Sequence, residues 1–346
     1  MTAATTPEER WRLGYRPALD GLRGIAIALV LLGHARLPGL HAASTVGVTL
    51  FFVLSGFLIT TLLLEERERT GQIDLFAFYK RRARRLLPAL VVFLAVIAVV
   101  LAVTGYGDRI VGSIAPPLLY YANWVLATGG ELPLLSHTWS LSVEEQFYIV
   151  WPLLLIGLLI VAAPRRLAAI MLTVAALITV LRLVLWESES IERIARATDT
   201  RADALLIGCA VAFFFAIRGR SLSKWSLAGG VFMLIVPSTL EVGIIRYGMG
   251  LTIAAAGGAL LVALAASRGS RLLEWRPLVW LGSISYSLYL WQTPAIILAR
   301  DSIEPGAFGA ATGIVIAVGL AVLSRRYVEM PFLRRSVATS RGVEPV

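Results

Sequence analysis

The chain has 346 residues, of which 58% are hydrophobic and only 16% charged, and its mean hydropathy is +0.77. Soluble proteins average about 25% charged residues, so this composition excludes an ordinary soluble domain and indicates a membrane protein with many spans. The net charge is +10, but the arginines cluster at the ends of apolar runs, as topology signals do, so we expect no nucleic-acid partner. The single cysteine, Cys209, lies in an apolar run, which excludes intrachain disulfides, and we expect no metal site.

Apolar runs of about twenty residues predict ten membrane-spanning helices. The runs cover residues 22–39, 46–64, 86–104, 145–162, 167–186, 203–217, 226–241, 248–267, 281–299 and 307–324. With both termini in the cytoplasm, most of the 32 lysines and arginines fall in cytoplasmic loops. We therefore predict an all-α fold, a polytopic transmembrane helix bundle of about ten spans in the cell membrane, with both termini cytoplasmic. Residues 1–335 would form one membrane-embedded domain and residues 336–346 a short cytoplasmic tail.

Two connections between the predicted spans are longer than the others. Residues 65–85 mix charged residues with leucine and aromatic residues, which is typical of a segment lying in the cytoplasmic interface. Residues 105–142 contain the stretch Ile114–Trp124, which is too apolar for a free external loop. We expect this stretch to fold back against the bundle as a partial helix or a re-entrant segment.

The first predicted span carries the ionisable residues Asp20, Arg23 and His34. Arg23 and His34 are separated by about three helical turns and roughly 16 Å of rise, so they fall on nearly the same face, with Asp20 one turn below. Ionisable groups inside an apolar helix are costly and usually indicate a functional site. The alternative is that Arg23 extends to the lipid headgroups and His34 ends the helix.

The next two motifs belong to the second and third spans. Ser55 and Gly56 lie inside an apolar helix, where such a pair normally permits close helix packing, although it could also let a substrate chain pass. Arg81, Arg82 and Arg85 precede the third span at the cytoplasmic face. They fit a topology signal, and they equally fit a receptor for a cytoplasmic polyphosphate, because guanidinium groups bind phosphate bidentately.

The densest polar cluster, residues 137–152, stands where the long external segment meets the fourth span. Ser142 and Glu145 form a capping-box pattern, which gives Glu145 a structural role. Glu144 has no such role and needs a buried partner or a function. We expect a polar pocket near the outer face, formed by His137, Trp139, Ser140 and Glu144, with Tyr148 in the same motif.

The ninth span contains Tyr286, Gln292 and Pro294, which predict a kinked, polar-lined helix. The sequence has no serine-hydrolase elbow, zinc-protease motif, P-loop or dinucleotide fingerprint. Serine-hydrolase chemistry of that kind and ATP hydrolysis are therefore not supported.

The motif order closely resembles the acyltransferase-3 family. These are integral-membrane O-acyltransferases of about ten spans that transfer acetyl or other short acyl groups to sugars, cell-envelope polymers or secondary metabolites. The motifs are D-G-L-R-G followed by His34, F-F-V-L-S-G-F, R-R-A-R-R-L-L-P, H-T-W-S-L-S-V-E-E-Q-F-Y, D-x-R-x-D-A-L-L-x-G, Y-S-L-Y-L-W and R-Y-V-E-M-P-F. The resemblance extends from Tyr15 to Arg335.

The resemblance implies that Arg23 and His34 are essential and that Arg82, Arg85 and Glu144 take part in the reaction. Members often carry a histidine in the ninth helix where this chain has Gln292. An amide forms hydrogen bonds but does not exchange protons, so an acid or base role at this position is not expected here.

We predict an O-acyltransferase that uses cytoplasmic acyl-CoA, with acetyl-CoA foremost, as co-substrate and has no bound cofactor. His34 is the predicted general base, because imidazole titrates near 6.5. Asp20 and Arg23 would form a pair, with Arg23 stabilising the thioester oxyanion or a CoA phosphate. The CoA phosphates are assigned to Arg81, Arg82 and Arg85.

Several alternatives stay open at this point. Glu144 would either orient His34 or bind the acceptor, a hydroxyl-bearing glycan or small molecule. The predicted acceptor pocket comprises Ser55, His137, Trp139, Ser140, Tyr148, Tyr286 and Gln292. A covalent acyl-enzyme on Ser55, Ser140 or Ser142 is a second route. The alternative function is a transporter or flippase whose polar helices line a translocation path.

Overall fold

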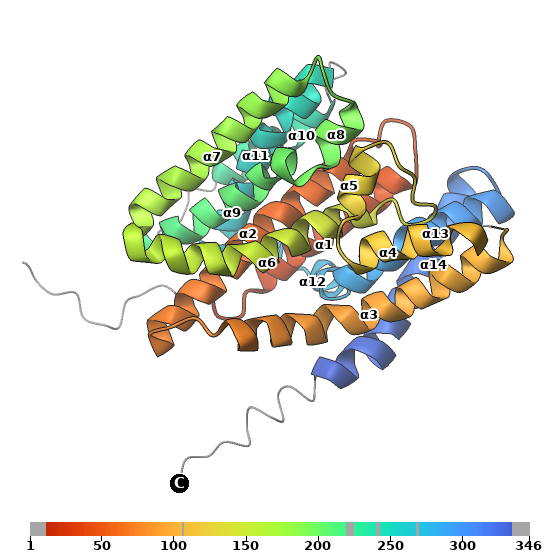
Figure 1. Cartoon of the computed structure of the whole chain (residues 1–346), viewed down its shortest axis with the longest axis horizontal. Helices are drawn as coiled ribbons and strands as arrows, with labels where there is room; N and C mark the ends of the chain where they lie inside the picture. Colours follow the sequence, from red (N-terminus) through yellow and green to blue (C-terminus); the bar gives the residue numbers. More distant parts are fainter. Residues whose placement is uncertain (1–11, 106, 219–224, 240–242, 268–269, 334–346) are drawn as a thin grey trace, which may run out of the picture.

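The computed structural model describes residues 12–105, 107–218, 225–239, 243–267 and 270–333, which form helices joined by loops, with no strand among them (Figure 1). The helices are α1 (Pro17–His34), α2 (Ala43–Thr70), α3 (Leu75–Val103), α4 (Ile110–Leu118), α5 (Ala122–Ala127), α6 (Thr138–Val161), α7 (Pro164–Leu185), α8 (Ile191–Arg196), α9 (Thr198–Arg218), α10 (Trp225–Thr239), α11 (Gly250–Ser267), α12 (Arg276–Ser283), α13 (Ser285–Ser302) and α14 (Ala307–Ser324). A 3-10 turn covers Gly107–Arg109, and π-helical turns cover Ile244–Met249 and Arg325–Glu329. The all-α prediction is confirmed.

Among the described residues, 7 helical segments are long and apolar enough to cross a membrane. They are Pro17–His34, Ala43–Thr70, Leu75–Val103, Thr138–Val161, Pro164–Leu185, Ile244–Ser267 and Ala307–Leu333. Each of the predicted apolar runs overlaps a helix. These features support a multi-pass membrane protein, whereas the count of ten spans, the cytoplasmic termini and the single domain 1–335 stay predictions. The predicted tail 336–346 lies outside the described residues.

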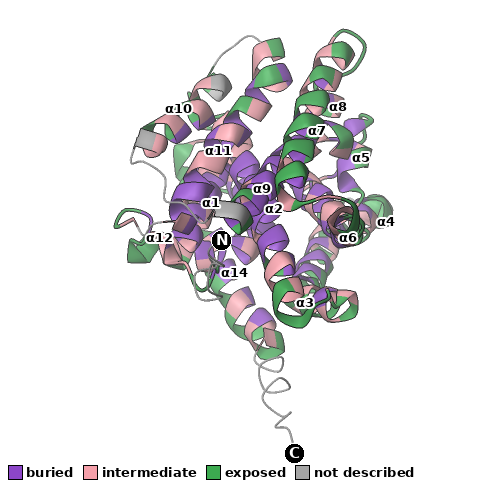
Figure 2. Ribbon diagram, turned by 90° about the vertical axis from the view of Figure 1, so that its left-hand side faces the viewer, coloured by how far each residue is buried: buried purple, intermediate pink, exposed green. Residues whose placement is uncertain are grey.

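Helices α1, α2 and α9 lie at the centre of the bundle and are buried over most of their length (Figure 2). A Cβ atom added to Gly56 would lie 1.9 Å from the Leu205 carbonyl oxygen, and one added to Gly208 would lie 2.2 Å from that of Val53. Helices α2 and α9 therefore touch through their backbones, as small residues allow in membrane helices. The packing interpretation of the Ser55–Gly56 pair is confirmed.

The interfacial position of residues 65–85 stays a prediction, and the structure shows that these residues belong to α2 and α3, which continue until only the turn 71–74 separates them. Gly71 ends α2 with a φ of 81°, in the left-handed region that favours glycine. Asp74 caps α3 by accepting a hydrogen bond from the Ala77 amide at 2.8 Å. The arginine cluster therefore lies on the first turns of α3, so the positions of its side chains are set by the helix.

The long connection between α3 and α6 folds back on the bundle, as the sequence predicts for residues 105–142. It contains the short helices α4 and α5. Ile114 and Tyr120 pack against a buried cluster that includes residues of α3, α6 and α13. Part of the apolar surface of this connection is thereby buried, whereas Val111 and Leu119 stay exposed.

The D-x-R-x-D motif of α9 builds a buried polar cluster. Arg182 Nη2 of α7 lies 3.0 Å from Asp203 Oδ2, and both side chains are buried. Arg201 donates to Thr49 Oγ1 at 3.2 Å and lies over the Trp139 ring, 5.7 Å from its centroid. These contacts join α9 to α7, α2 and α6.

Candidate functional site

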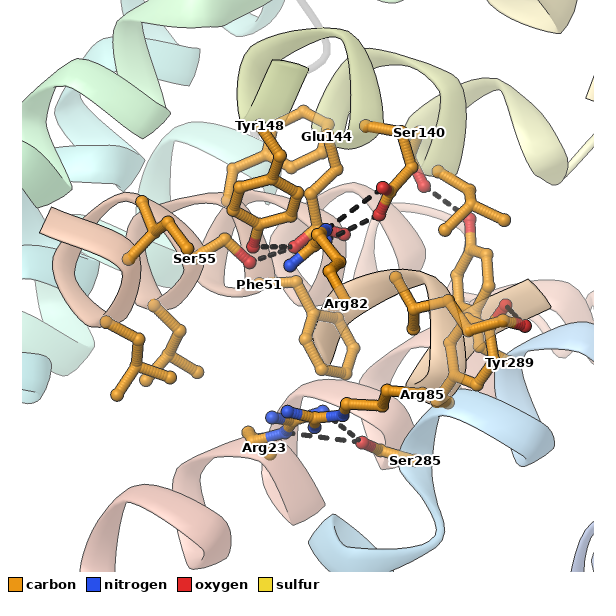
Figure 3. Close-up of a pocket in the computed structure, with 18 of the residues that line it drawn as sticks. Arg23, Phe51, Ser55, Arg82, Arg85, Ser140, Glu144, Tyr148, Ser285 and Tyr289 are labelled. Atoms are coloured by element: carbon orange, nitrogen blue, oxygen red, sulfur yellow. Dashed lines mark hydrogen bonds and ion pairs between the residues drawn. The ribbon is translucent and has the colours of Figure 1, made fainter. Parts of the chain in front are cut away.

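A cavity of about 270 Å³ lies between α1, α2, α3, α6 and α13, and we call it the chamber (Figure 3). Its polar lining consists of Arg23, Ser55, Arg82, Arg85, Ser140, Glu144, Glu145, Tyr148, Ser285, Tyr286 and Tyr289. Its apolar lining consists of Val48, Phe51, Phe52, Leu54, Leu58, Ile59, Leu62, Leu86 and Leu141. A concave site with a few convergent polar groups on an apolar wall is the usual form of a ligand-binding site.

A second cavity of about 610 Å³ adjoins the chamber at the end of α2 and the start of α3. Arg82 and Arg85 line both cavities. The second cavity continues past Glu66 and Arg81, which form an ion pair at 3.1 Å. Because the two cavities share Arg82 and Arg85, we call the second cavity, which is lined with arginine and glutamate, the entrance. It lies on the side that the charge distribution predicts to be cytoplasmic.

Arg82 is bound to Glu145 by two hydrogen bonds, from Nε to Oε2 at 3.0 Å and from Nη2 to Oε1 at 2.5 Å. The guanidinium group also lies over the Tyr148 ring, 3.2 Å from its centroid. Helix α6 begins at Thr138 and not at Ser142, so the capping-box prediction for Glu145 is wrong. The Glu145 carboxylate instead neutralises Arg82, and the Nε and Nη2 atoms of this guanidinium group already donate to it.

Glu144 accepts two hydrogen bonds through the same oxygen, Oε1. Tyr148 donates at 2.8 Å, and Ser55 donates from α2 (Figure 3). An ionised carboxylate only accepts hydrogen bonds, so both hydroxyl groups are turned toward it. Of the predicted acyl carriers, Ser55 and Ser140 line the chamber, whereas Ser142 is buried and bonded to the backbone of its own helix.

Arg23 and Arg85 lie side by side at another wall of the chamber (Figure 3). Arg23 donates to Ser285 Oγ, from Nε at 3.4 Å and from Nη2 at 3.2 Å. Within the described part of the chain, no ion pair joins either arginine to a carboxylate, so the predicted pair between Arg23 and Asp20 is wrong. Two adjacent guanidinium groups without an anionic partner are suited to binding an anion.

His34 lies about 16 Å further along α1 than Arg23 and does not line the chamber. Its Nδ1 atom is 2.8 Å from Gln292 Oε1. Gln292, and not Glu144, therefore makes the hydrogen bond that orients His34.

A series of hydrogen bonds joins Ser140 and Tyr289, which line the chamber, to His137, which lies near His34. Ser140 Oγ is 2.5 Å from the Tyr289 hydroxyl, which donates to the His137 carbonyl at 2.6 Å. His137 Nε2 is 3.1 Å from the Leu290 carbonyl oxygen. Burial lowers the pKa of His137 to about 3, so its ring is neutral at physiological pH.

The predicted site residues divide into two groups. Those that line the chamber are Arg23, Ser55, Arg82, Arg85, Ser140, Glu144, Tyr148 and Tyr286. Those that do not are Asp20, His34, Arg81, His137, Trp139 and Gln292. Among the described residues, no group of three or more His, Cys, Asp or Glu side chains could hold a metal ion.

Sequence reasoning missed three polar residues of the chamber, Glu145, Ser285 and Tyr289. Helical spacing from Gln292 would have found Ser285 and Tyr289, which lie seven and three positions earlier on nearly the same face of α13. No local signal connects Glu145 to Arg82, which is 63 positions away.

Bacterial O-acetyltransferases are similar to this chain. It is 34% identical, over 92% of its length, to the "Putative peptidoglycan O-acetyltransferase YrhL" of Bacillus subtilis, and 32% identical, over 93%, to the "Peptidoglycan O-acetyltransferase OatA" of Listeria monocytogenes. It is 31% identical, over 95% of its length, to the "O-acetyltransferase OatA" of Staphylococcus aureus. The matched regions cover 55%, 56% and 59% of these relatives, so the chain spans little more than half of their length.

No solved structure matches the chain. A family model described as "Acyltransferase domain" matches residues 16–325. This range contains every residue that lines the chamber, together with His34 and Gln292. The chain therefore belongs to the acyltransferase-3 family.

Proposed function

We propose that this chain is a membrane O-acyltransferase that transfers an acetyl or other short acyl group from cytoplasmic acyl-CoA to a hydroxyl group of a cell-envelope saccharide, foremost peptidoglycan. Family membership and the names of the relatives support O-acetylation of a glycan. The observation that carries the proposal is the chamber, a polar site inside an apolar bundle with an arginine-lined entrance. We place the protein in the cell membrane.

The donor phosphates would bind Arg23 and Arg85. These arginines lie beside each other and form no ion pair with a carboxylate among the described residues, whereas Arg81 and Arg82 each form an ion pair with a glutamate. Charge-assisted hydrogen bonds to a phosphate contribute about 1.5–3 kcal/mol each. Of the three arginines predicted to bind the donor, we therefore retain only Arg85. Arg23 takes the place of Arg81 and Arg82.

The spacing along α1 suits a long donor. Arg23 and His34 are about 16 Å apart along the helix, a distance appropriate to the extended pantetheine arm of CoA. The arm would pass Glu144, whose carboxylate can accept hydrogen bonds from its amide N–H groups. Tyr289 lies along this path, so its hydrogen bond with Ser140 would open when the donor is bound.

In this mechanism His34 acts as the general base. The His34 imidazole takes the proton of the acceptor hydroxyl while the hydroxyl oxygen attacks the thioester carbon. The carbon–sulfur bond breaks, an ester carbon–oxygen bond forms, and the proton passes from the imidazolium to the CoA thiolate. Acyl-CoA and alcohol thus become ester and free CoA, with no oxidant, reductant or second co-substrate.

The proposal can be tested with purified protein in nanodiscs, supplied with acetyl-CoA and peptidoglycan fragments. We expect release of CoA that depends on the acceptor, together with an acetyl ester on the glycan. His34→Ala should retain acetyl-CoA binding and lose roughly 10²–10⁴-fold in turnover, the usual contribution of a general base. His137→Ala should lose less, and His41→Ala, in an exposed loop, is the matched control.

Two results would contradict the proposal. A protein that binds no acyl-CoA and releases no CoA in the presence of acceptor would exclude this donor. Near-normal turnover in His34→Gln, which retains hydrogen bonding and loses basicity, would reduce His34 to a structural role.

A further inference from the structure

The two nitrogens of the His34 ring lie in different surroundings. Nδ1 is 2.8 Å from Gln292 Oε1 and 3.5 Å from Thr293 Oγ1. Nε2 has no hydrogen-bond partner among the described residues and is not among their buried, unsatisfied atoms. The Nδ1 side is therefore occupied by α13, and Nε2 is the nitrogen accessible to a substrate.

In the structure the completely buried Gln292 amide points its oxygen at His34, while its nitrogen donates to Thr293 Oγ1 at 2.6 Å. A carbonyl oxygen accepts hydrogen bonds and cannot donate them. The neutral His34 ring in this arrangement carries its proton on Nδ1, which leaves the lone pair on Nε2.

If the Gln292 amide were reversed, with its nitrogen toward His34, it would not support a basic Nε2 atom. It would present an N–H group to Nδ1 and stabilise the opposite neutral form of the ring, with the proton on Nε2. Once the ring became an imidazolium, both ring nitrogens would be donors, and two N–H groups would face each other. Only an oxygen at this position satisfies the ring before and after it accepts a proton.

We propose that Gln292 is a positioning residue that keeps His34 protonated on Nδ1 and presents Nε2 as the basic nitrogen. The inference rests on the proposed function, because it names the atom that takes the acceptor proton. That proton moves from the acceptor hydroxyl to Nε2 and from Nε2 to the CoA sulfur. The Nδ1 proton stays on Nδ1 and remains hydrogen-bonded to Gln292 throughout.

The charges around His34 explain why an amide differs here from a carboxylate. Arg36 follows α1, Arg300 of α13 donates to the Ala35 carbonyl at 2.6 Å, and the nearby ring of His137 is neutral. These groups are positive or uncharged, and Gln292 adds no charge. A carboxylate at position 292 would accept the same hydrogen bond and would also favour the imidazolium.

The form of the ring can be measured without any activity assay. The chain has only 3 histidines, so ¹⁵N-histidine labelling gives few ring signals, and subtraction of the His34→Gln spectrum assigns those of His34. We expect the pattern of a ring protonated on Nδ1 in the wild type and in Gln292→Glu. In Gln292→Met, which has no acceptor at this position, the two neutral forms should mix. A wild-type ring protonated on Nε2, or an unchanged pattern in Gln292→Met, would overturn the inference.

The pH dependence of turnover separates positioning from a merely structural role. Gln292→Glu should retain turnover while the acid limb of its pH profile moves to higher pH. Gln292→Met should lose roughly tenfold or more in kcat with little change in KM for acetyl-CoA, because a ring in the wrong form cannot accept the proton. Equal losses in both variants, with an unchanged pH profile, would contradict positioning.

The two assays fail independently of each other. If the wild type showed no acyl transfer, the proposed function would fail, while the ring pattern would still decide whether Gln292 sets the state of His34. If Gln292→Met did not fold, Gln292→Asn would replace it, since its shorter amide does not reach Nδ1. A full retention of the Nδ1 pattern in Gln292→Asn would then overturn the inference.

Discussion

The ion pair between Arg82 and Glu145 distinguishes a structural arginine from a donor-binding one. We consider Arg82→Met and Glu145→Gln, singly and together. The pair is joined by two hydrogen bonds, and the side chains are 21% and 7% exposed. Each single change leaves a charged or strongly polar group in the chamber wall without its partner, whereas the double change removes both.

The expected magnitude follows from this burial. Removing one partner of a buried ion pair costs about 3–5 kcal/mol. Arg82 borders water-accessible cavities, so we expect the lower end, about 3 kcal/mol. For a chain of this size that corresponds to a fall in Tm of roughly 5 °C or more. The double variant should recover most of the loss, because replacing a whole buried pair is often nearly neutral.

The assay is thermal unfolding in detergent, followed with a thiol-reactive dye. Cys209 is the single cysteine and is buried, so it reacts only when the protein opens. Arg81→Met is the matched control on the same helix, because Arg81 is 56% exposed and its ion pair with Glu66 should contribute less than about 1 kcal/mol. Acetyl-CoA binding is measured in parallel for Arg82→Met and Arg85→Met.

The Tm and binding measurements together can refute the separate roles of Arg82 and Arg85. We expect Arg82→Met to lower Tm, and Arg85→Met to weaken acetyl-CoA binding with little change in Tm. If Arg82→Met weakened binding more than Arg85→Met while Tm was unchanged, Arg82 would be the phosphate ligand. The division of roles inferred from the ion pair would then be wrong.

Three further predictions concern packing, pH and topology. Gly56→Ala should destabilise the protein by about 1–3 kcal/mol, because the added Cβ would lie 1.9 Å from a carbonyl oxygen of α9. Gly157→Ala is the control, since a Cβ atom added there would meet no atom within 4 Å. Equal Tm values for the two variants would contradict close packing of α2 against α9. Burial lowers the pKa of His137 from 6.5 to about 3, so the unfolded chain binds more protons between these values and stability should fall as pH drops below 6.5. His137→Gln should show a shallower fall of Tm with pH, and an identical slope would exclude this residue as the cause. Reporter fusions at Gly71 should be cytoplasmic and those at Gly105 external, and the opposite result would reverse the side assigned to the entrance.

Local signals in the sequence predicted the helices well. Each apolar run overlaps a helix, although the run 281–299 extends over the break between α12 and α13. The folded-back segment between α3 and α6 follows from apolar residues too numerous for a free loop. The short turn between α2 and α3 was also predictable, because Gly71 and Asp74 are a helix-ending and a helix-capping residue. It was missed because the charges of residues 65–85 suggested an interfacial segment.

The capping-box pattern shows where local reasoning fails. Ser142 and Glu145 have the spacing of a helix start, but α6 begins earlier, and Glu145 is bound to an arginine on α3. A pattern of four residues describes only the backbone around it. It carries no information about a charge that another helix brings within hydrogen-bond distance.

The sequence by itself determined the fold class, the apolar runs and most of the polar residues that line the chamber, because hydropathy and helical spacing are properties of neighbouring residues. Only the tertiary structure decided which of these residues are paired. It joined Arg82 to Glu145, placed Arg85 beside Arg23, and set Gln292 against His34. Such pairings depend on which helices touch and at what depth, and that is set by packing of whole helices, as where the backbones of α2 and α9 meet at their glycines.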